Sequence, residues 1–136
     1  MDIKSQSIVA VDNDVRTLDR IKMILDSTHT VLATGDPTRA LTWLQHNATV
    51  AAIVVVHDLP GGKAMGLLEA ARKFRPEARR ILIANYSDLA QFVEGLHTGA
   101  IQRTISKPID PIELLGLVRI RPAAAKTGAA ANVAAA

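Results

Sequence analysis

The stretch that most constrains the fold is residues 51–56, AAIVVV, in which every side chain is apolar. A strand with one face in water alternates apolar and polar side chains, whereas a strand covered on both faces is apolar throughout. The run is followed by His57 and Asp58 and then by LPGG, whose proline and glycines favour a turn. We therefore expect a central strand of a parallel sheet, with polar side chains delivered to the rim where the strand ends.

Short β-branched runs alternate with stretches of helical periodicity along the whole chain, which is the pattern of repeated βα units. The expected strands cover residues 7–11, 30–34, 51–56, 80–84 and 101–105. The expected helices run from an Asp14 cap to Asp26, over 37–46, over 64–74, from an Asp88 cap to Gly99, and over 111–121. This order predicts a doubly wound α/β fold with a parallel sheet.

A chain of 136 residues has the size of one domain, which we place at residues 1–121. Residues 122–136, PAAAKTGAAANVAAA, carry little that could pack and are expected to form a flexible tail. The chain contains no cysteine, so thiolate catalysis and zinc-thiolate sites are excluded. No apolar stretch approaches the ~20 residues that span a bilayer, and we expect a cytoplasmic protein that does not bind membranes.

The net charge of +3 is modest, and aromatic residues make up only 3% of the chain. A basic patch without interleaved aromatic side chains is more typical of a solvated rim than of a nucleic-acid site, so no nucleic-acid partner is expected. We also expect His29, His46 and His97 to lie at the surface, and Trp43 to pack in the core. The clustered basic residues expected on the rim are Arg72, Lys73, Arg75, Arg79 and Arg80.

Polar residues that follow the expected strands include Asp12, Asn13, His57, Asp58 and Lys107. Together with the VDND start, the LPGG loop, the ANYSD segment and GAIQRTISKP, they resemble the receiver domain of two-component response regulators from Ile8 to Ile120. The segment NYSDLAQFVEGLHTGAI is especially similar to receivers that accompany cyclic-di-nucleotide phosphodiesterase domains. The resemblance implies a flavodoxin-like (βα)5 fold with five parallel strands in the order 2-1-3-4-5.

The resemblance also implies a site in which an aspartate ending strand three accepts a phosphoryl group. Acidic residues after strand one help to hold Mg²⁺, and a Thr or Ser after strand four and a lysine bind the phosphoryl oxygens. The acceptor usually stands four positions before the loop proline, and this count reaches Val56. A second count, eight positions back from Gly66, reaches Asp58. We prefer the proline count because its span is shorter, so Asp58 remains the alternative acceptor.

The other family positions also depart from the pattern. The second acidic position falls on Asn13, the hydroxyl position on Ala84, and the aromatic switch position on Thr104, while Asp12 and Lys107 match. A lysine that faces valine has to stay hydrated or pair with Asp12, because an unpaired buried charge is costly. We therefore predict an ion pair between Lys107 and Asp12, with Asp14 acting as a helix cap.

The leading hypothesis is a degenerate receiver that binds no cofactor or metal, has no enzymatic activity, and acts through protein contacts. The sequence contains no GxSxG or Walker-type motif, so the enzyme classes that these motifs indicate are not expected. The expected partners are a histidine kinase, an output-domain protein or a second copy, bound on the side of helix four, strand five and helix five. The alternative is a working phosphoacceptor that uses Asp58 in a shifted loop and binds Mg²⁺, with Asp12 and Asp14 as further metal ligands. The expected interaction residues are Asp88, Gln91, Phe92, Arg103, Thr104 and Arg119.

Overall fold

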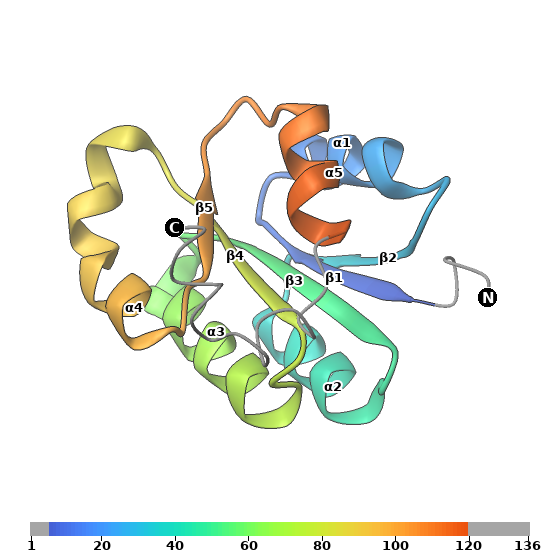
Figure 1. The fold of residues 1–136 in the computed structure, drawn as a ribbon, viewed down its shortest axis with the longest axis horizontal. Coiled ribbons are helices and arrows are strands. Elements are labelled where there is room, and N and C mark those ends of the chain that lie inside the picture. Colours follow the sequence, from blue (N-terminus) through green and yellow to red (C-terminus); the bar gives the residue numbers. More distant parts are fainter. Residues whose placement is uncertain (1–5, 120–136) are drawn as a thin grey trace.

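The computed structural model describes residues 6–119, which form one parallel five-stranded sheet between two layers of helices (Figure 1). The sheet order is β2-β1-β3-β4-β5, and every neighbouring pair is parallel. This confirms the predicted flavodoxin-like fold and its strand order. The strands are β1 (Ser7–Val11), β2 (Thr30–Thr34), β3 (Val50–Val56), β4 (Arg79–Ile83) and β5 (Arg103–Ile105).

Helices cover both faces of the sheet. Figure 1 shows α1 (Val15–Leu25) and α5 (Pro111–Arg119) on one face, with α2 (Pro37–His46), α3 (Lys63–Phe74) and α4 (Val93–Thr98) on the other. Asp14 and Asp36 cap α1 and α2 by accepting hydrogen bonds from the backbone N–H groups of Arg16 and Thr38. Each cap satisfies an N–H group that has no partner inside its helix. The predicted role of Asp14 as a cap is thus confirmed.

The core lies on the three inner strands of the sheet, β1, β3 and β4, and the apolar run predicted the place of β3 among them. All residues of β1 are buried, and every residue of β3 except Ala51 is buried as well. The side chains of Ile53, Val54 and Val55 have no exposed surface, because β3 lies between β1 and β4 and beneath helices on both faces. Burial of this apolar surface is the main favourable contribution to folding. Trp43 is partly buried and packs against this core.

The segment between β4 and β5 differs most from the sequence prediction. Asp88 does not cap a helix there, since residues Tyr86–Phe92 form the 3-10 helix η3 and α4 begins only at Val93. α4 ends as predicted at Gly99, whose φ of 91° is the left-handed conformation favoured by glycine. Asp88 therefore lies inside η3 rather than at the start of a helix, and its carboxylate lies 3.2 Å from Nε2 of His57.

Two arginines assigned to a solvated rim are in fact buried. Arg79 and Arg80 begin β4 and are only 2% and 6% exposed. The Arg80 guanidinium donates hydrogen bonds to the carbonyl oxygens of Gly99, Pro76 and Ala78. A guanidinium presents several donors in a fixed plane, so these carbonyls replace the water that a rim position would supply.

His29 was also expected at the surface, but it is only 2% exposed. Its Nδ1 lies 2.9 Å from the hydroxyl oxygen of Thr28 in the connection between α1 and β2.

None of the helices found in residues 6–119 has the length and apolar character that a membrane span requires. The predicted tail, residues 122–136, and the predicted domain ends at 1 and 121 lie outside the residues that the structure describes.

Burial of His29 predicts that acid destabilises the protein. Desolvation, with a smaller contribution from Arg119, lowers the pKa of His29 below its ordinary value of 6.5. The unfolded chain then binds the proton more tightly, so the free energy of unfolding should fall as the pH drops below about 6.5. Urea unfolding at pH 7.5 and 5.5 should show this loss.

The variant His29→Gln should lose less stability than the wild type over the same pH interval. His46→Gln is the control, because His46 is exposed and its removal should leave the pH dependence intact. Equal pH dependence in the wild type and His29→Gln would contradict the assignment.

Candidate functional site

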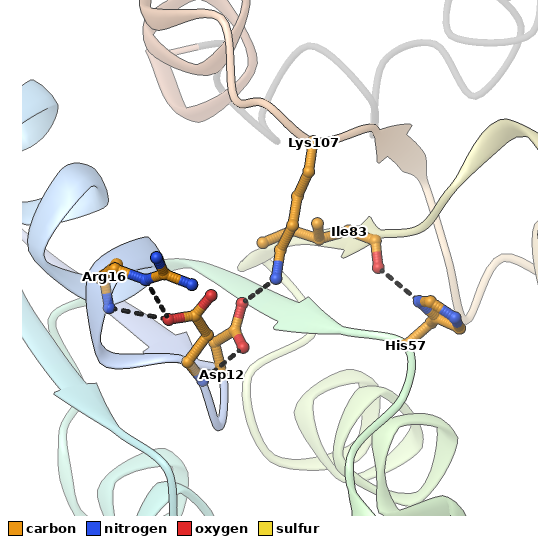
Figure 2. A network of polar contacts seen from close by, with 6 residues as sticks. Asp12, Arg16, His57, Ile83 and Lys107 are labelled. Atoms are coloured by element: carbon orange, nitrogen blue, oxygen red, sulfur yellow. Dashed lines mark hydrogen bonds and ion pairs between the residues drawn. The ribbon is translucent and has the colours of Figure 1, made fainter.

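The predicted ion pair between Asp12 and Lys107 is present at the carboxyl end of the sheet. Lys107 Nζ lies 3.1 Å from Asp12 Oδ2, and Figure 2 shows the lysine reaching from the segment after β5 towards Asp12, the residue that follows β1. The Asp12 side chain has no exposed surface, whereas that of Lys107 is 34% exposed. The ion pair therefore compensates a buried carboxylate with an ammonium that still contacts water.

The other carboxylate oxygen of Asp12, Oδ1, is bound by the backbone. Oδ1 accepts a hydrogen bond of 2.8 Å from the N–H of Asp14, whereas Oδ2 faces Lys107 without a hydrogen bond of acceptable geometry. Asn13, which takes the second acidic position of the family, is exposed.

The hydrogen bond from the N–H of Arg16 lowers the pKa of Asp14 below its ordinary value. Asp14 therefore stays ionised at neutral pH, as a helix cap should.

Apolar side chains stand where the resemblance places the reactive groups. Val56 ends β3 and Ala84 follows β4, and each is 2% exposed. Asp58 is exposed, in the turn beyond His57. Val56, Asp58, Ala84 and Lys107 nevertheless line one small cavity of about 50 Å³, together with His57, Ile83 and Asn85. The cavity thus contains both candidate acceptor positions.

His57 is the site residue whose partners sequence reasoning missed. Its Nε2 lies 3.2 Å from Asp88 Oδ2, and its Nδ1 lies 3.3 Å from the carbonyl oxygen of Ile83, a contact drawn in Figure 2. Its ring also meets the Phe92 ring edge-on, with the centroids 5.7 Å apart. The signal that could have indicated the pair is that His57 and Asp88 follow the ends of adjacent strands β3 and β4.

A magnesium ion at this rim would have to compete with Lys107 for the Asp12 carboxylate. Mg²⁺ binds oxygen ligands and relies on carboxylates for its charge compensation. The Asp12 carboxylate is already paired with Lys107, and Asn13 contributes no charge. In the part of the chain that the structure describes, no three His, Asp or Glu side chains gather as metal ligands would.

The residues predicted to form an interaction surface are only partly exposed. Phe92 is 9% exposed and packs in the core, so its assignment to an exposed surface was wrong. The reason is that it lies at the end of η3, which turns its ring towards His57. Asp88 is half-buried by its contact with His57. Among the remaining members, Gln91 and Arg119 are exposed, and Arg103 and Thr104 are half-buried.

Removal of the Lys107 charge should destabilise the protein. Lys107→Met leaves the buried Asp12 carboxylate without its cation, and the partial exposure of Lys107 keeps the loss near ~1–2 kcal/mol in urea unfolding. The double variant Lys107→Met/Asp12→Asn should recover part of this loss, because an amide is less costly to bury than an unpaired carboxylate. Wild-type stability in Lys107→Met would show that the ion pair contributes nothing.

No protein-family model matches the chain. Over 121 residues, 88% of its length, the chain is 31% identical to the hydrogenase transcriptional regulatory protein HoxA of Cupriavidus necator. It spans about a quarter of the length of the curated relatives that it matches, 24% and 23% for two HoxA proteins.

Two solved receiver domains share both fold and sequence with the chain. The signal receiver domain of an HD domain-containing protein from Pseudomonas fluorescens Pf-5 is 29% identical, with a TM-score of 0.75 and 85% of each chain covered. A CheY-like response regulator receiver domain protein from Methanospirillum hungatei JF-1 is 29% identical, with a TM-score of 0.71 and with 82% of this chain and 88% of that chain covered. The fold and these likenesses together support a response regulator receiver domain with a role in signal transduction.

Proposed function

We propose that this receiver domain acts without phosphorylation, by protein-protein contact. The observation that carries the proposal is the end of β3, where the buried Val56 lines the same small cavity as Lys107, which is itself paired with Asp12. Valine has no oxygen that could accept a phosphoryl group, and the lysine that would bind the transferred group is already paired with Asp12. In this proposal the domain is not an enzyme and serves as a signalling scaffold.

Separate positions support the same conclusion. In phosphoryl transfer, charge develops on the transferred oxygens, and catalysis depends on cations and hydrogen-bond donors placed to stabilise it. Ala84 offers no hydroxyl, and Asn13 reduces the negative charge available to hold a metal. The proposal therefore includes no bound Mg²⁺ and no other cofactor. It also includes a cytoplasmic location, where the protein partners of receivers are found.

A second candidate function has one observation in its favour. Asp58 lines the same cavity as Lys107, so a carboxylate is available within the pocket region. In this alternative, Asp58 accepts the phosphoryl group and shares Mg²⁺ with Asp12. Two features make Asp58 the weaker candidate. Its side chain is exposed in the turn, and the Asp12 carboxylate would have to leave Lys107 to bind the metal.

Receiver domains interact with histidine kinases and with output domains. The proposed partner of this chain belongs to one of these classes or is a second copy of the chain. The proposed contact surface lies on the side of η3, α4, β5 and α5. Its members are Gln91, Arg103, Thr104 and Arg119, with Asp88 at its edge. Without a phosphoryl group, the conformation of this surface is set by the fold or by the binding energy of the partner.

The test is exposure of the protein to Mg²⁺ and a small phosphodonor such as acetyl phosphate, followed by measurement of the intact mass. The proposal expects no phosphorylated species, and no change in the amide NMR spectrum on addition of beryllofluoride with Mg²⁺. A phosphorylatable receiver domain serves as the positive control for the reagents.

If a phosphorylated species forms, the Asp58→Asn variant identifies its site. Loss of the modification in this variant would establish the Asp58 alternative and overturn the proposal. A modification that persists in Asp58→Asn would also overturn it, and would place the acceptor at another residue.

A further inference from the structure

His57 connects the small cavity with the proposed contact surface. Its side chain lines the cavity beside Val56 and Lys107, and it also contacts Asp88 and Phe92 of η3. The side chains of His57 and Asp88 are only 16% and 28% exposed. Water competes less with a polar contact that is largely shielded from it than with one at an open surface.

Both ring nitrogens of His57 face atoms that can only accept hydrogen bonds. Nε2 faces the Asp88 carboxylate at 3.2 Å, and Nδ1 faces the Ile83 carbonyl oxygen at 3.3 Å. A neutral imidazole has one N–H and would turn a lone pair towards one of these oxygens. The tautomer that carries its proton on Nε2 donates a hydrogen bond to the Asp88 carboxylate.

Further contacts hold the same segment. The Phe92 ring meets the His57 ring at 76° and is buried among core residues, so η3 is attached at its end as well as at Asp88. Gln91 Nε2 lies 3.4 Å from the other Asp88 oxygen, Oδ1. The histidine ring thus lies between the end of β3 and the 3-10 helix that leads into α4.

We propose that His57 and Asp88 form a latch that holds η3 against the end of β3 and fixes the contact surface in one conformation without a phosphoryl group. This inference deepens the proposed function and rests on it, because it names what sets the conformation of the same surface. The latch joins two segments that follow adjacent strands, β3 and β4. Its energy comes from contacts within the chain and requires no metal or phosphodonor.

The test is amide hydrogen exchange of the full chain at one fixed pH, compared among the wild type, His57→Leu, Asp88→Asn and the double variant. The reporter is η3, where the N–H of Asp88 donates to the carbonyl oxygen of Asn85. Either single change should speed exchange of η3 roughly fivefold, while the amides of β1 and β3 keep their protection. The double variant should exchange about as fast as His57→Leu, because the contact with Asp88 is already lost once the imidazole is absent.

Asp58→Asn is the matched control. It makes the same chemical change one residue from His57, on an exposed side chain that has no ion pair within residues 6–119, and should leave the exchange of η3 unchanged. The latch would be disproved by wild-type exchange of η3 in Asp88→Asn and His57→Leu, by equal acceleration in Asp58→Asn, or by fully additive effects. These readouts need no phosphodonor, so a failed latch and a phosphorylatable Asp58 are separate results.

Discussion

A carboxylate without any exposed surface at the end of β1 constrains the whole rim of this sheet. Asp12 is compensated by the N–H of Asp14 and by the ammonium of Lys107, which arrives from the segment after β5. The ion pair therefore ties the last strand to the first across the end of the sheet. Arg20 of α1 strengthens this connection with two hydrogen bonds to the carbonyl oxygen of Ile109, just before α5. Together these contacts place α5 beside α1.

The rim is arranged so that its charges are satisfied within the chain. Lys107 is paired with Asp12, and His57 with Asp88, while the apolar side chains of Val56 and Ala84 line the cavity near them. Phosphoryl transfer would bring new negative charge to this rim, which cations and hydrogen-bond donors must stabilise. Here the same positions form closed contacts, which is the physical basis for proposing a scaffold with a constant conformation.

The differences between prediction and structure concern polar residues whose environment is made by distant segments. The charge of Arg80 predicts an exposed side chain, but hydrogen bonds to the carbonyl oxygens of Gly99 and Pro76 allow it to be buried. The residues next to His29 in the sequence do not predict that it is buried. Asp88 has the spacing of a helix cap, but His57 lies close enough to pair with it. For Arg80 and Asp88, local spacing describes only the nearest turn of chain, and a competing partner comes from a segment distant in the sequence.

The sequence by itself determined the types and order of the elements, because apolar periodicity and capping residues such as Asp14 and Asp36 act within a few positions of the chain. It also indicated the Lys107–Asp12 ion pair, since parallel strands bring their carboxyl ends to one rim and a buried charge needs a counter-charge. Only the tertiary structure decided the 3-10 conformation of Tyr86–Phe92, the burial of Phe92 and the pairing of His57 with Asp88. These depend on the distance between side chains that are far apart in the chain, and that distance is set by packing of the complete sheet and its helices.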